Sequence, residues 1–322
     1  MHLIVRFRKP FVALEEALQE AGCALLREMT HADEALWRAS TACLVDFCDA
    51  ARQLGRSWRL SRLLRARAIA LVAIDRDAPW HKGVRRRKLW LMAKLGLLDL
   101  YASHSLQGAD RYAERVLYLP NAARLDAYHL GERTLESMRT AAAYEHDVSF
   151  LGNLDADGYP EHRARVAFLH ALRERLARES VRLALFESSG MSTAEQVRVI
   201  QASRINLSAG AAADDAGERS WGLPERCYGI PACGGFLLSD ARRHAADDFA
   251  ANREWAEYSD LDDCVAKIRY WLAHFAQARA VAEAAHARVL SQHTYAHRAR
   301  RLMIALEEWR EARRGAPTSG AE

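Results

Sequence analysis

Short apolar runs alternate with longer amphipathic stretches along most of the chain. Runs rich in branched apolar residues are typical of buried strands, whereas apolar residues that recur every three or four positions indicate helices. In the first part of the sequence this pattern predicts strands at 2–6, 23–26, 41–47, 69–74, 99–102 and 116–119. Helices are expected between them, at 11–21, 49–67, 88–98 and 109–112. Strands that alternate with helices in this way form a parallel sheet.

The same alternation begins again near residue 148. Here the pattern predicts strands at 148–151, 183–186, 205–207 and 236–238. It predicts helices at 162–178, 193–202, 261–272, 276–290 and 295–310. Polar and helix-forming residues without a strand signal fill 121–144, so we expect two domains, 1–140 and 141–322. The expected fold class is therefore α/β, with two Rossmann-like domains.

Residues 221–240 (WGLPERCYGIPACGGFLLSD) combine a short helix of small residues, the pair Gly234 and Gly235, and an apolar strand. Arg226 falls in the first turn of this helix. The first amides of a helix lack intrahelical partners and carry partial positive charge, which favours an anion. An arginine there adds a bidentate contact for phosphate. The stretch therefore predicts a phosphate site, although a plain packing unit, whose glycines let helix and strand approach, fits the same pattern.

A second group of candidate residues follows the apolar run at 69–74. Ionisable and aromatic side chains crowd this loop: Asp75, Arg76, Asp77, Trp80, His81 and Lys82. Open α/β sheets bind ligands outside the carboxyl ends of their strands, so we expect Asp77 or His81 to act as general base on an acceptor hydroxyl. His104, which follows the strand at 99–102, reaches the same edge. An Asx-type turn with a packed tryptophan is the alternative.

Gly152 and Asn153 follow the strand at 148–151. Glycine permits close approach of a ligand to the backbone, or a positive φ. We expect this loop to lie against a ligand, while a tight turn would require the same residue.

Composition and charge limit the classes of partner. Half of the 322 residues are hydrophobic and 27% are charged, as in a globular protein, and the net charge is only +4. Arginines gather at 52–67 and 85–88, where a solvated face and a patch for acidic lipid headgroups or an anionic acceptor both fit. Stacking aromatic residues are missing between these arginines apart from Trp58, so nucleic acid is not an expected partner.

The cysteines and the N-terminus indicate the compartment. The six cysteines include no C-x-x-C pair and lie in apolar surroundings, so we expect buried free thiols in a reducing cytoplasm and no metal site among them. No apolar run approaches the roughly 20 residues of a membrane span, and MHLIVRFRKP is not a secretory signal. We expect a cytoplasmic protein, with peripheral contact at the inner face of the membrane left open.

Several motifs together resemble one enzyme family. The motifs of the second half are FLGN (150–153), INLS (205–208), ERCYGIPACGGFLLSD (225–240) and HTYAHR (293–298). They resemble the GT-B glycosyltransferases of the CgeB-like, glycosyl transferases group 1 type. The first half fits the same proteins more loosely, through DRDAPWHKG (75–83) and YLPNA (118–122).

This resemblance implies a fold, an activity and site roles. The fold would be two Rossmann-like domains facing across a cleft, 1–140 for the acceptor and 141–322 for the nucleotide sugar, with a terminal helix at about 295–310 returning to the first domain. The activity would be transfer of a sugar from a nucleotide-sugar donor to a hydroxyl of a glycan, a protein or a small molecule, without a metal or another cofactor. The implied donor and phosphate residues are Gly152, Asn153, Glu225, Arg226 and Tyr228. The implied acceptor-side residues are Asp75, Arg76, Trp80, Lys82 and His104.

The sequence departs from the family pattern at two positions. Related enzymes often carry a glutamate where Gly229 stands, and retaining relatives carry another where Trp221 stands. Glu225 is the nearest acidic substitute, about one helical turn or 5 Å away. Donor identity and stereochemical outcome therefore stay open, and a non-catalytic binding or assembly module of the same fold is the alternative function.

Overall fold

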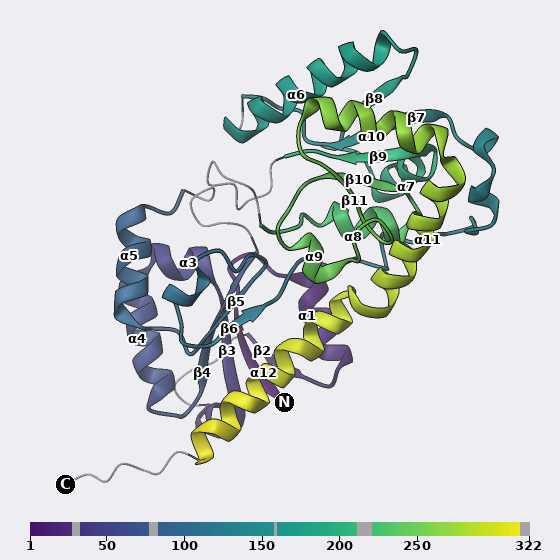
Figure 1. The fold of residues 1–322 in the computed structure, drawn as a ribbon. Helices are drawn as coiled ribbons and strands as arrows, with labels where there is room; N and C mark the ends of the chain where they lie inside the picture. Colours follow the sequence, from purple (N-terminus) through teal and green to yellow (C-terminus); the bar gives the residue numbers. More distant parts are fainter. Residues whose placement is uncertain (28–32, 77–82, 158–159, 211–220, 316–322) are drawn as a thin grey trace. The chain divides into compact units, whose positions relative to one another are not determined.

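The computed structural model describes residues 1–27, 33–76, 83–157, 160–210 and 221–315. The chain divides into two compact units. Unit 1 comprises residues 1–120 and the C-terminal segment from residue 295, and unit 2 comprises residues 121–294. Each unit is an α/β structure built around one parallel sheet (Figure 1).

Unit 1 contains a six-stranded sheet in the order β2-β1-β3-β4-β5-β6, in which every neighbouring pair is parallel. The strands are β1 (His2–Arg6), β2 (Ala24–Leu26), β3 (Ser40–Asp46), β4 (Ala70–Asp75), β5 (Leu100–Ser103) and β6 (Val116–Tyr118). The helices are α1 (Val12–Glu20), α2 (Glu34–Ala39), α3 (Phe47–Arg52), α4 (Leu54–Arg65), α5 (Arg86–Leu95), the 3-10 turn η1 (Ala109–Arg111) and α12 (Tyr295–Gly315). Helices α3 to α5 cover one face of the sheet, and α1 and α12 cover the other (Figure 1).

The core of unit 1 follows from its strand sequences. All six residues of β4 are buried, as expected for a strand covered by helices on both faces. Beside it, the rings of Phe47, Tyr101 and Tyr112 pack together, with centroids 4.7 to 5.3 Å apart. This aromatic cluster packs against the carboxyl ends of the central strands.

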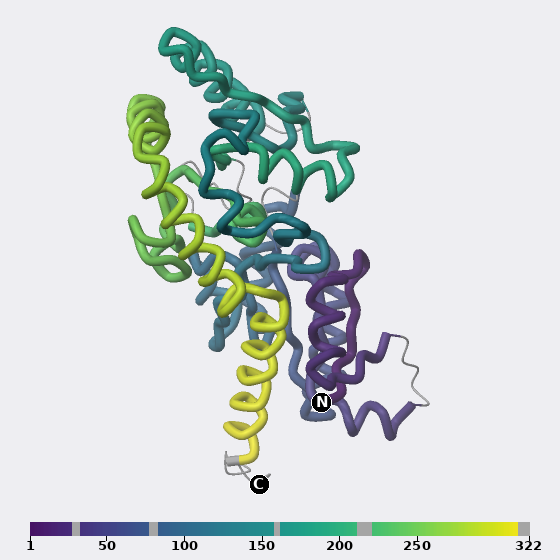
Figure 2. The backbone as a smooth tube through the Cα atoms, turned by 90° about the vertical axis from the view of Figure 1, so that its right-hand side faces the viewer, coloured from purple at the N-terminus to yellow at the C-terminus, as the bar shows by residue number. Residues whose placement is uncertain are grey.

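Helix α12 belongs to unit 1, which confirms the expected return of the C-terminal helix to the first part of the chain. It packs on α1, where the rings of Phe11 and Tyr295 meet edge to face with centroids 5.5 Å apart. Arg298 is buried and donates from Nε to the carbonyl oxygen of Pro120 at 2.9 Å. In Figure 2 the yellow tube of α12 runs beside the purple tube that contains α1.

Unit 2 contains a five-stranded parallel sheet in the order β11-β10-β9-β7-β8. The strands are β7 (His146–Gly152), β8 (Leu183–Glu187), β9 (Ser203–Ser208), β10 (Leu237–Asp240) and β11 (Ala256–Tyr258). The helices are α6 (Pro160–Ala177), α7 (Thr193–Gln201), α8 (Arg226–Ala232), α9 (Ala245–Asp248), α10 (Leu261–Ala273) and α11 (Phe275–Gln292), with 3-10 turns η2 (Ser137–Arg139) and η3 (Ala141–Ala143).

Segment 121–145 lies in unit 2, although the sequence pattern places most of it before the boundary at 140. Its packing explains the difference. A Cβ atom on Gly234 would come within 2.8 Å of the Leu130 side chain and 3.0 Å of the Met138 sulfur. Gly234 also has a φ of +75°, so this position needs glycine both for space and for backbone conformation.

Some elements differ from the expected pattern. The helix expected at 49–67 is two helices, α3 and α4, separated at Gln53, and Asp46 caps the start of α3 by accepting from the amide of Asp49 at 3.0 Å. Helix α2 and strand β11 were not predicted. All six cysteines are free and buried, as expected. Among the described helices, none combines the length and the apolar character needed to cross a membrane.

Candidate functional site

Arg226 lies at the carboxyl edge of the unit 2 sheet. It is the first residue of α8 and is half-buried. Its Nε donates to Ser208 Oγ at 2.9 Å, and its Nη2 donates to the carbonyl oxygen of Gly210 at 2.9 Å. Its Nη1 donates to none of the residues that the structure describes. The guanidinium is thus fixed at the end of β9 with donor capacity to spare.

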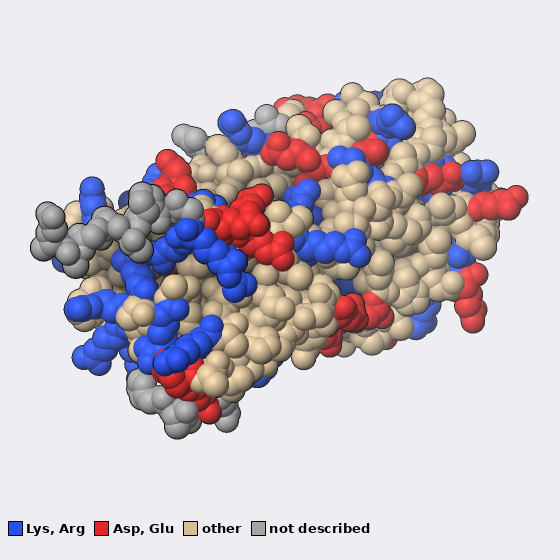
Figure 3. Space-filling model, turned by 90° about the horizontal axis from the view of Figure 1, so that it is seen from below, with Lys and Arg blue, Asp and Glu red and all other residues tan. Residues whose placement is uncertain are grey.

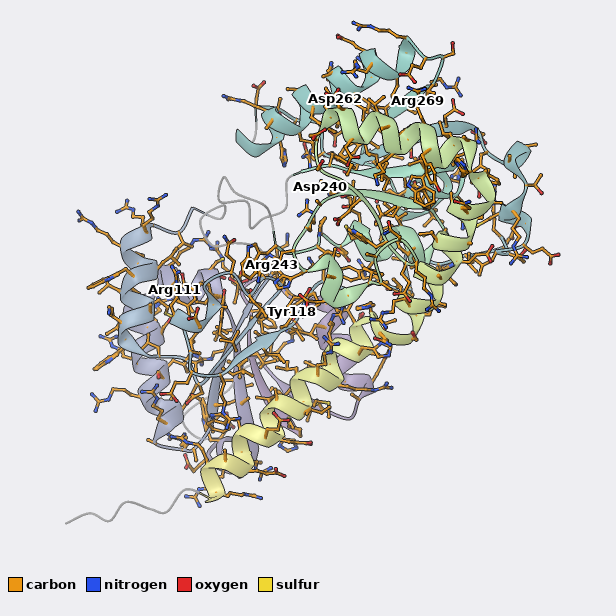
Figure 4. All side chains as sticks on the ribbon, viewed as in Figure 1. Arg111, Tyr118, Asp240, Arg243, Asp262 and Arg269 are labelled. Carbon is orange, nitrogen blue, oxygen red and sulfur yellow. The ribbon has the colours of Figure 1, made fainter. Side chains whose placement is uncertain are left out.

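A second arginine, Arg242, supports the same edge. It is almost fully buried and pairs in a bidentate manner with Asp240, at 2.7 Å from Nη2 and 3.3 Å from Nε. Its Nη1 donates to Gly222 O at 2.9 Å, and its Nη2 lies 3.4 Å from Gly210 O. Figure 4 shows Asp240 at the end of β10 and Arg243 in the loop that follows.

The two guanidiniums influence each other. Loss of contact with water lowers the pKa of the Arg226 guanidinium, and the positive charge of Arg242 lowers it further. Burial also raises the pKa of Tyr258 well above its ordinary value, and the charge of Asp240 adds to this effect. The neutral Tyr258 hydroxyl donates to Ser208 O at 2.9 Å, so β9 and β11 are tied together beside Arg226. An added anion would relieve the repulsion between the two arginines.

The helix amides expected to bind phosphate are used within the protein. The amides of Cys227, Tyr228 and Gly229 donate to the carbonyl oxygens of Pro224 and Glu225, at 2.9 to 3.0 Å. The anion-binding capacity of this end of α8 therefore comes from the Arg226 side chain rather than from these three amides.

Glu225 and Gly229 lie beside Tyr128. Glu225 is exposed, yet the surrounding protein raises the pKa of its carboxyl group, and the charge of Asp126 adds to the rise. A Cβ atom on Gly229 would contact the Tyr128 ring at 3.5 Å. The Tyr128 hydroxyl donates to Gln196 at 2.7 Å, which holds the ring in place. The Tyr128 ring thus lies in van der Waals reach of the Gly229 position on α8.

Tyr228 is a core residue. It is fully buried, and its hydroxyl donates to Asp248 Oδ2 at 2.5 Å. Its ring packs with Phe249 and His293, at centroid distances of 5.9 and 5.6 Å. The structure therefore separates Tyr228 from the edge at which Arg226 lies and gives it a packing role.

The loop after β7 is a turn. A Cβ atom on Gly152 would lie 2.8 Å from the ring of Phe150, so the chain's own side chain occupies the space. Asn153 Oδ1 accepts from the amide of Asp155 at 2.7 Å, and its carbonyl oxygen accepts from Arg165. Gly152 is the last residue of β7 and has no positive φ, so a tight turn does not require it, and the Asx contact of Asn153 begins the loop.

In unit 1, Asp75 and His104 meet at the ends of β4 and β5. Asp75 is 4% exposed and accepts from the Tyr101 hydroxyl at 2.6 Å. His104 is equally buried; its Nδ1 lies 3.4 Å from the Asp75 carbonyl oxygen, and its Nε2 has no hydrogen-bond partner among the described residues. Burial raises the pKa of Tyr101 well above its ordinary value, and the Asp75 charge adds to this. Both predicted residues therefore lie at the expected edge.

The remaining candidates of this loop lie partly outside the description. Asp77, Trp80, His81 and Lys82 fall within 77–82, outside the described residues. Arg76 is described, and its Nη2 lies 3.5 Å from Asp46 Oδ2. Among the described residues, no group of three or more His, Cys, Asp or Glu side chains is placed to hold a metal ion.

Sequence reasoning found Arg226 and missed Arg242 and Tyr128. The signal for Arg242 was its position two residues after an acidic residue that ends a buried strand. Tyr128 gave no such signal, because its contact with Gly229 spans about a hundred residues of chain.

The comparisons with known proteins address the same features. The Glycosyl transferase-like family matches residues 131–304. No curated protein matches the sequence. Among solved structures, sucrose-phosphate synthase from Thermosynechococcus elongatus is similar, with a TM-score of 0.64, 10% identity, and coverage of 97% of this chain and 99% of that one.

Two further structures share the fold. Trehalose-phosphate synthase from Burkholderia vietnamiensis has a TM-score of 0.60 at 11% identity, covering 98% of this chain and 99% of that one. HepE from Anabaena, solved with UDP and glucose, has a TM-score of 0.59 at 10% identity, and the match covers 95% of this chain and 99% of that one. The family match extends over more than half of the chain and includes the Arg226 edge. The chain therefore belongs to the Glycosyl transferase-like family, and its fold is that of the GT-B glycosyltransferases.

Proposed function

We propose that Arg226 binds the diphosphate of the nucleotide-sugar donor and that the sugar passes to a hydroxyl acceptor. The observation that carries this proposal is the position of the Arg226 guanidinium, which is held by Ser208 and Gly210 at the sheet edge, with no described residue accepting from Nη1. Ligands of open α/β sheets bind at this edge. Because HepE was solved with UDP and the trehalose-phosphate synthase is a UDP-forming enzyme, UDP is the first nucleotide to test.

The chemistry of this step needs a positive group next to the leaving phosphate. When the bond between sugar and phosphate breaks, negative charge grows on the phosphate oxygen, and a fixed guanidinium stabilises that charge. The Arg242–Asp240 pair keeps the backbone around Gly210 in place, so Arg242 is a positioning residue. The guanidinium of Arg226 takes the role that a divalent cation has in other transferases, and we propose a metal-independent reaction.

Unit 1 carries the candidate bases. If Nδ1 of His104 keeps its proton and donates to the Asp75 carbonyl oxygen, Nε2 is a free proton acceptor for an acceptor hydroxyl. Asp77 and His81 remain proposed bases of the same loop. The acceptor is a glycan, a protein or a small molecule, and residues of unit 1 are the proposed acceptor side.

The first test is nucleotide binding to an Arg226 variant. We expect Arg226→Ala to weaken UDP binding by roughly 10- to 100-fold, because a charged hydrogen bond contributes about 1.5–3 kcal/mol. Titration calorimetry on the full chain measures this. Arg243→Ala, a matched control in the same loop region, removes an exposed arginine that lies 4.2 Å over the Trp221 ring and should change the affinity little. Equal affinities of the wild type and Arg226→Ala would contradict the proposed phosphate site.

A second candidate function is a non-catalytic binding or assembly module. The observation in its favour is the Tyr128 ring, which lies in van der Waals reach of Gly229, where related enzymes often carry a glutamate. Hydrolysis of UDP-sugars distinguishes the two functions. Turnover that disappears in Arg226→Ala would exclude the module, whereas nucleotide binding without any turnover across a panel of UDP-, GDP- and ADP-sugars would support it.

A peripheral membrane contact at the cytoplasmic face is also proposed, with no role for nucleic acid. Lys and Arg side chains gather over α4 and α5 in the face shown in Figure 3. Trp58 and Trp90, on these helices, are 44% and 60% exposed, and Arg62 lies 5.0 Å over the Trp58 ring. Basic residues beside exposed tryptophans suit an anionic bilayer surface. Sedimentation with phosphatidylserine vesicles, compared with neutral vesicles, tests this contact.

A further inference from the structure

A cavity lies at the carboxyl edge of the unit 1 sheet. Its volume is about 460 Å³. It is lined by residues that follow β1, β3 and β4: Arg8, Lys9, Pro10, Asp46, Cys48, Asp49, Arg52 and Arg76. The family match at 131–304 does not include any of them.

The cavity lies where the order of strand addition reverses, because the chain adds β2 on one side of β1 and β3 on the other. The chain leaves β1 towards α1 and leaves β3 towards α3, and these helices cover opposite faces of the sheet (Figure 1). The two connections therefore diverge and leave a crevice between them. In open α/β sheets this crevice is the place where ligands bind.

The charges around the cavity are unequal. Four side chains are basic and two are acidic. Both carboxylates are engaged: Asp46 caps α3 and lies 3.5 Å from Arg76, and Asp49 lies 3.2 Å from Arg52. Arg8 and Lys9 form no ion pair with any described residue. Two exposed positive charges thus have no counter-charge among the described residues, at a concave site, which favours a dianion.

One of the basic groups is held in place before any ligand binds. The Arg76 guanidinium lies 4.7 Å from the centroid of the Phe11 ring, and its Nη2 lies 3.5 Å from the carbonyl oxygen of Lys9. These contacts connect the loop after β4 with the loop after β1. A guanidinium fixed in this way loses less conformational entropy when it binds a planar or tetrahedral oxyanion.

We propose that this cavity binds a phosphomonoester group of the acceptor substrate. The inference rests on the proposed function, because it assigns unit 1 to the acceptor. Arg8 and Lys9 supply the positive charge that no described residue compensates. Arg76 supplies a guanidinium that is already held in place and can donate two parallel hydrogen bonds to the phosphate. Arg76 directly follows Asp75, whose backbone carbonyl contacts His104, so the phosphate site and the candidate base share the end of β4.

The experiment is an orthophosphate titration of the full chain with UDP at saturation, followed by phosphorus NMR. UDP keeps orthophosphate out of the donor site. We expect Arg8→Gln/Lys9→Gln to weaken orthophosphate binding by at least about tenfold, the loss that follows from removing charge-assisted hydrogen bonds. The control Arg173→Gln/Arg178→Gln removes two exposed arginines of unit 2, in and just after α6, and should leave binding unchanged.

The outcomes separate this proposal from the donor proposal. UDP binding is measured first. If UDP does not bind, the proposed donor site is contradicted, but the orthophosphate titration still tests the cavity of unit 1. Orthophosphate binding that UDP abolishes, or that both double variants weaken equally, would overturn the acceptor site. Binding that persists with UDP and is lost only in Arg8→Gln/Lys9→Gln supports it.

Competition identifies the source of the phosphate. If it belongs to a soluble sugar, glucose 6-phosphate displaces orthophosphate while glucose does not. If it belongs to a lipid, vesicles containing phosphatidic acid displace it. Either result supports the proposal. Displacement by neither, or equally by glucuronate, would overturn the assignment of a phosphomonoester.

Discussion

At the scale of single residues, Arg242 shows how far the carboxyl edge of the unit 2 sheet depends on one buried ion pair. It connects the Asp240 carboxylate at the end of β10 with the carbonyl oxygens of Gly210, after β9, and of Gly222, before α8. Arg226, by contrast, could be identified from the sequence, because an arginine at a helix start after a loop is a local pattern. The local signal for Arg242 is weaker: it follows an acidic strand end by two residues, and its contacts with Gly222 and Gly210 depend on how the loop after β10 folds back.

Replacing Arg242 tests this ion pair. We expect Arg242→Leu to lower the free energy of unfolding by about 3 kcal/mol, because it removes the guanidinium that pairs with the Asp240 carboxylate and donates to the Gly222 carbonyl oxygen. Urea denaturation measures the change. The neighbouring Arg243 is exposed, so Arg243→Gln should cost less than about 1 kcal/mol, the size of an exposed cation–π contact. If both variants lowered the free energy of unfolding equally, the buried Arg242–Asp240 pair would contribute no more to stability than the exposed Arg243.

At the scale of elements, the apolar runs predicted nearly every strand, since strands buried on both faces leave a clear pattern. Helix α2 escaped prediction because six residues are too short for a helical period to show, and strand β11 because its three residues, AEY, form no apolar run. The break between α3 and α4 was missed for another reason. The break falls at Gln53, inside a stretch of helix-forming residues with no glycine or proline at that position to mark it.

Helix α7 offers an element whose start can be tested. Ser192 and Glu195 form a capping box, in which Ser192 Oγ accepts from the Glu195 amide at 3.3 Å and the Glu195 carboxylate accepts from the Ser192 amide at 2.7 Å. We expect Ser192→Ala to destabilise the protein by about 1 kcal/mol, the usual contribution of an N-cap. Thr193→Ala, one residue further, should have little effect. Thermal unfolding monitored by circular dichroism compares the two.

The same box predicts a pH dependence. Hydrogen bonds from Ser192 lower the pKa of Glu195, so the folded state binds this proton less readily than the unfolded state. The stabilisation is therefore present above the ordinary glutamate pKa and is lost as the pH falls through the lowered value. The difference between wild type and Ser192→Ala should shrink on acidification, and a difference that grows would contradict this assignment.

At the scale of the whole molecule, unit 1 depends on a helix from the far end of the chain. Leu306 of α12 is fully buried, whereas Ile304, two residues earlier, is 54% exposed. We expect Leu306→Ala to destabilise unit 1 by roughly 2–4 kcal/mol and Ile304→Ala to have a small effect. Urea denaturation should show the loss, while UDP binding below the transition stays unchanged, because Arg226 lies in unit 2. Loss of UDP binding under native conditions would contradict the separation of the two units.

The return of α12 also sets an order of events during synthesis. A ribosome releases all of unit 2 before it releases residues 295–315, which unit 1 still lacks. The nascent chain therefore holds the first sheet with one face only partly covered, until its final segment emerges. A premature stop before residue 295 would leave Phe11 and the other apolar contacts of α1 open to chaperones and proteases, while the donor half could already be complete.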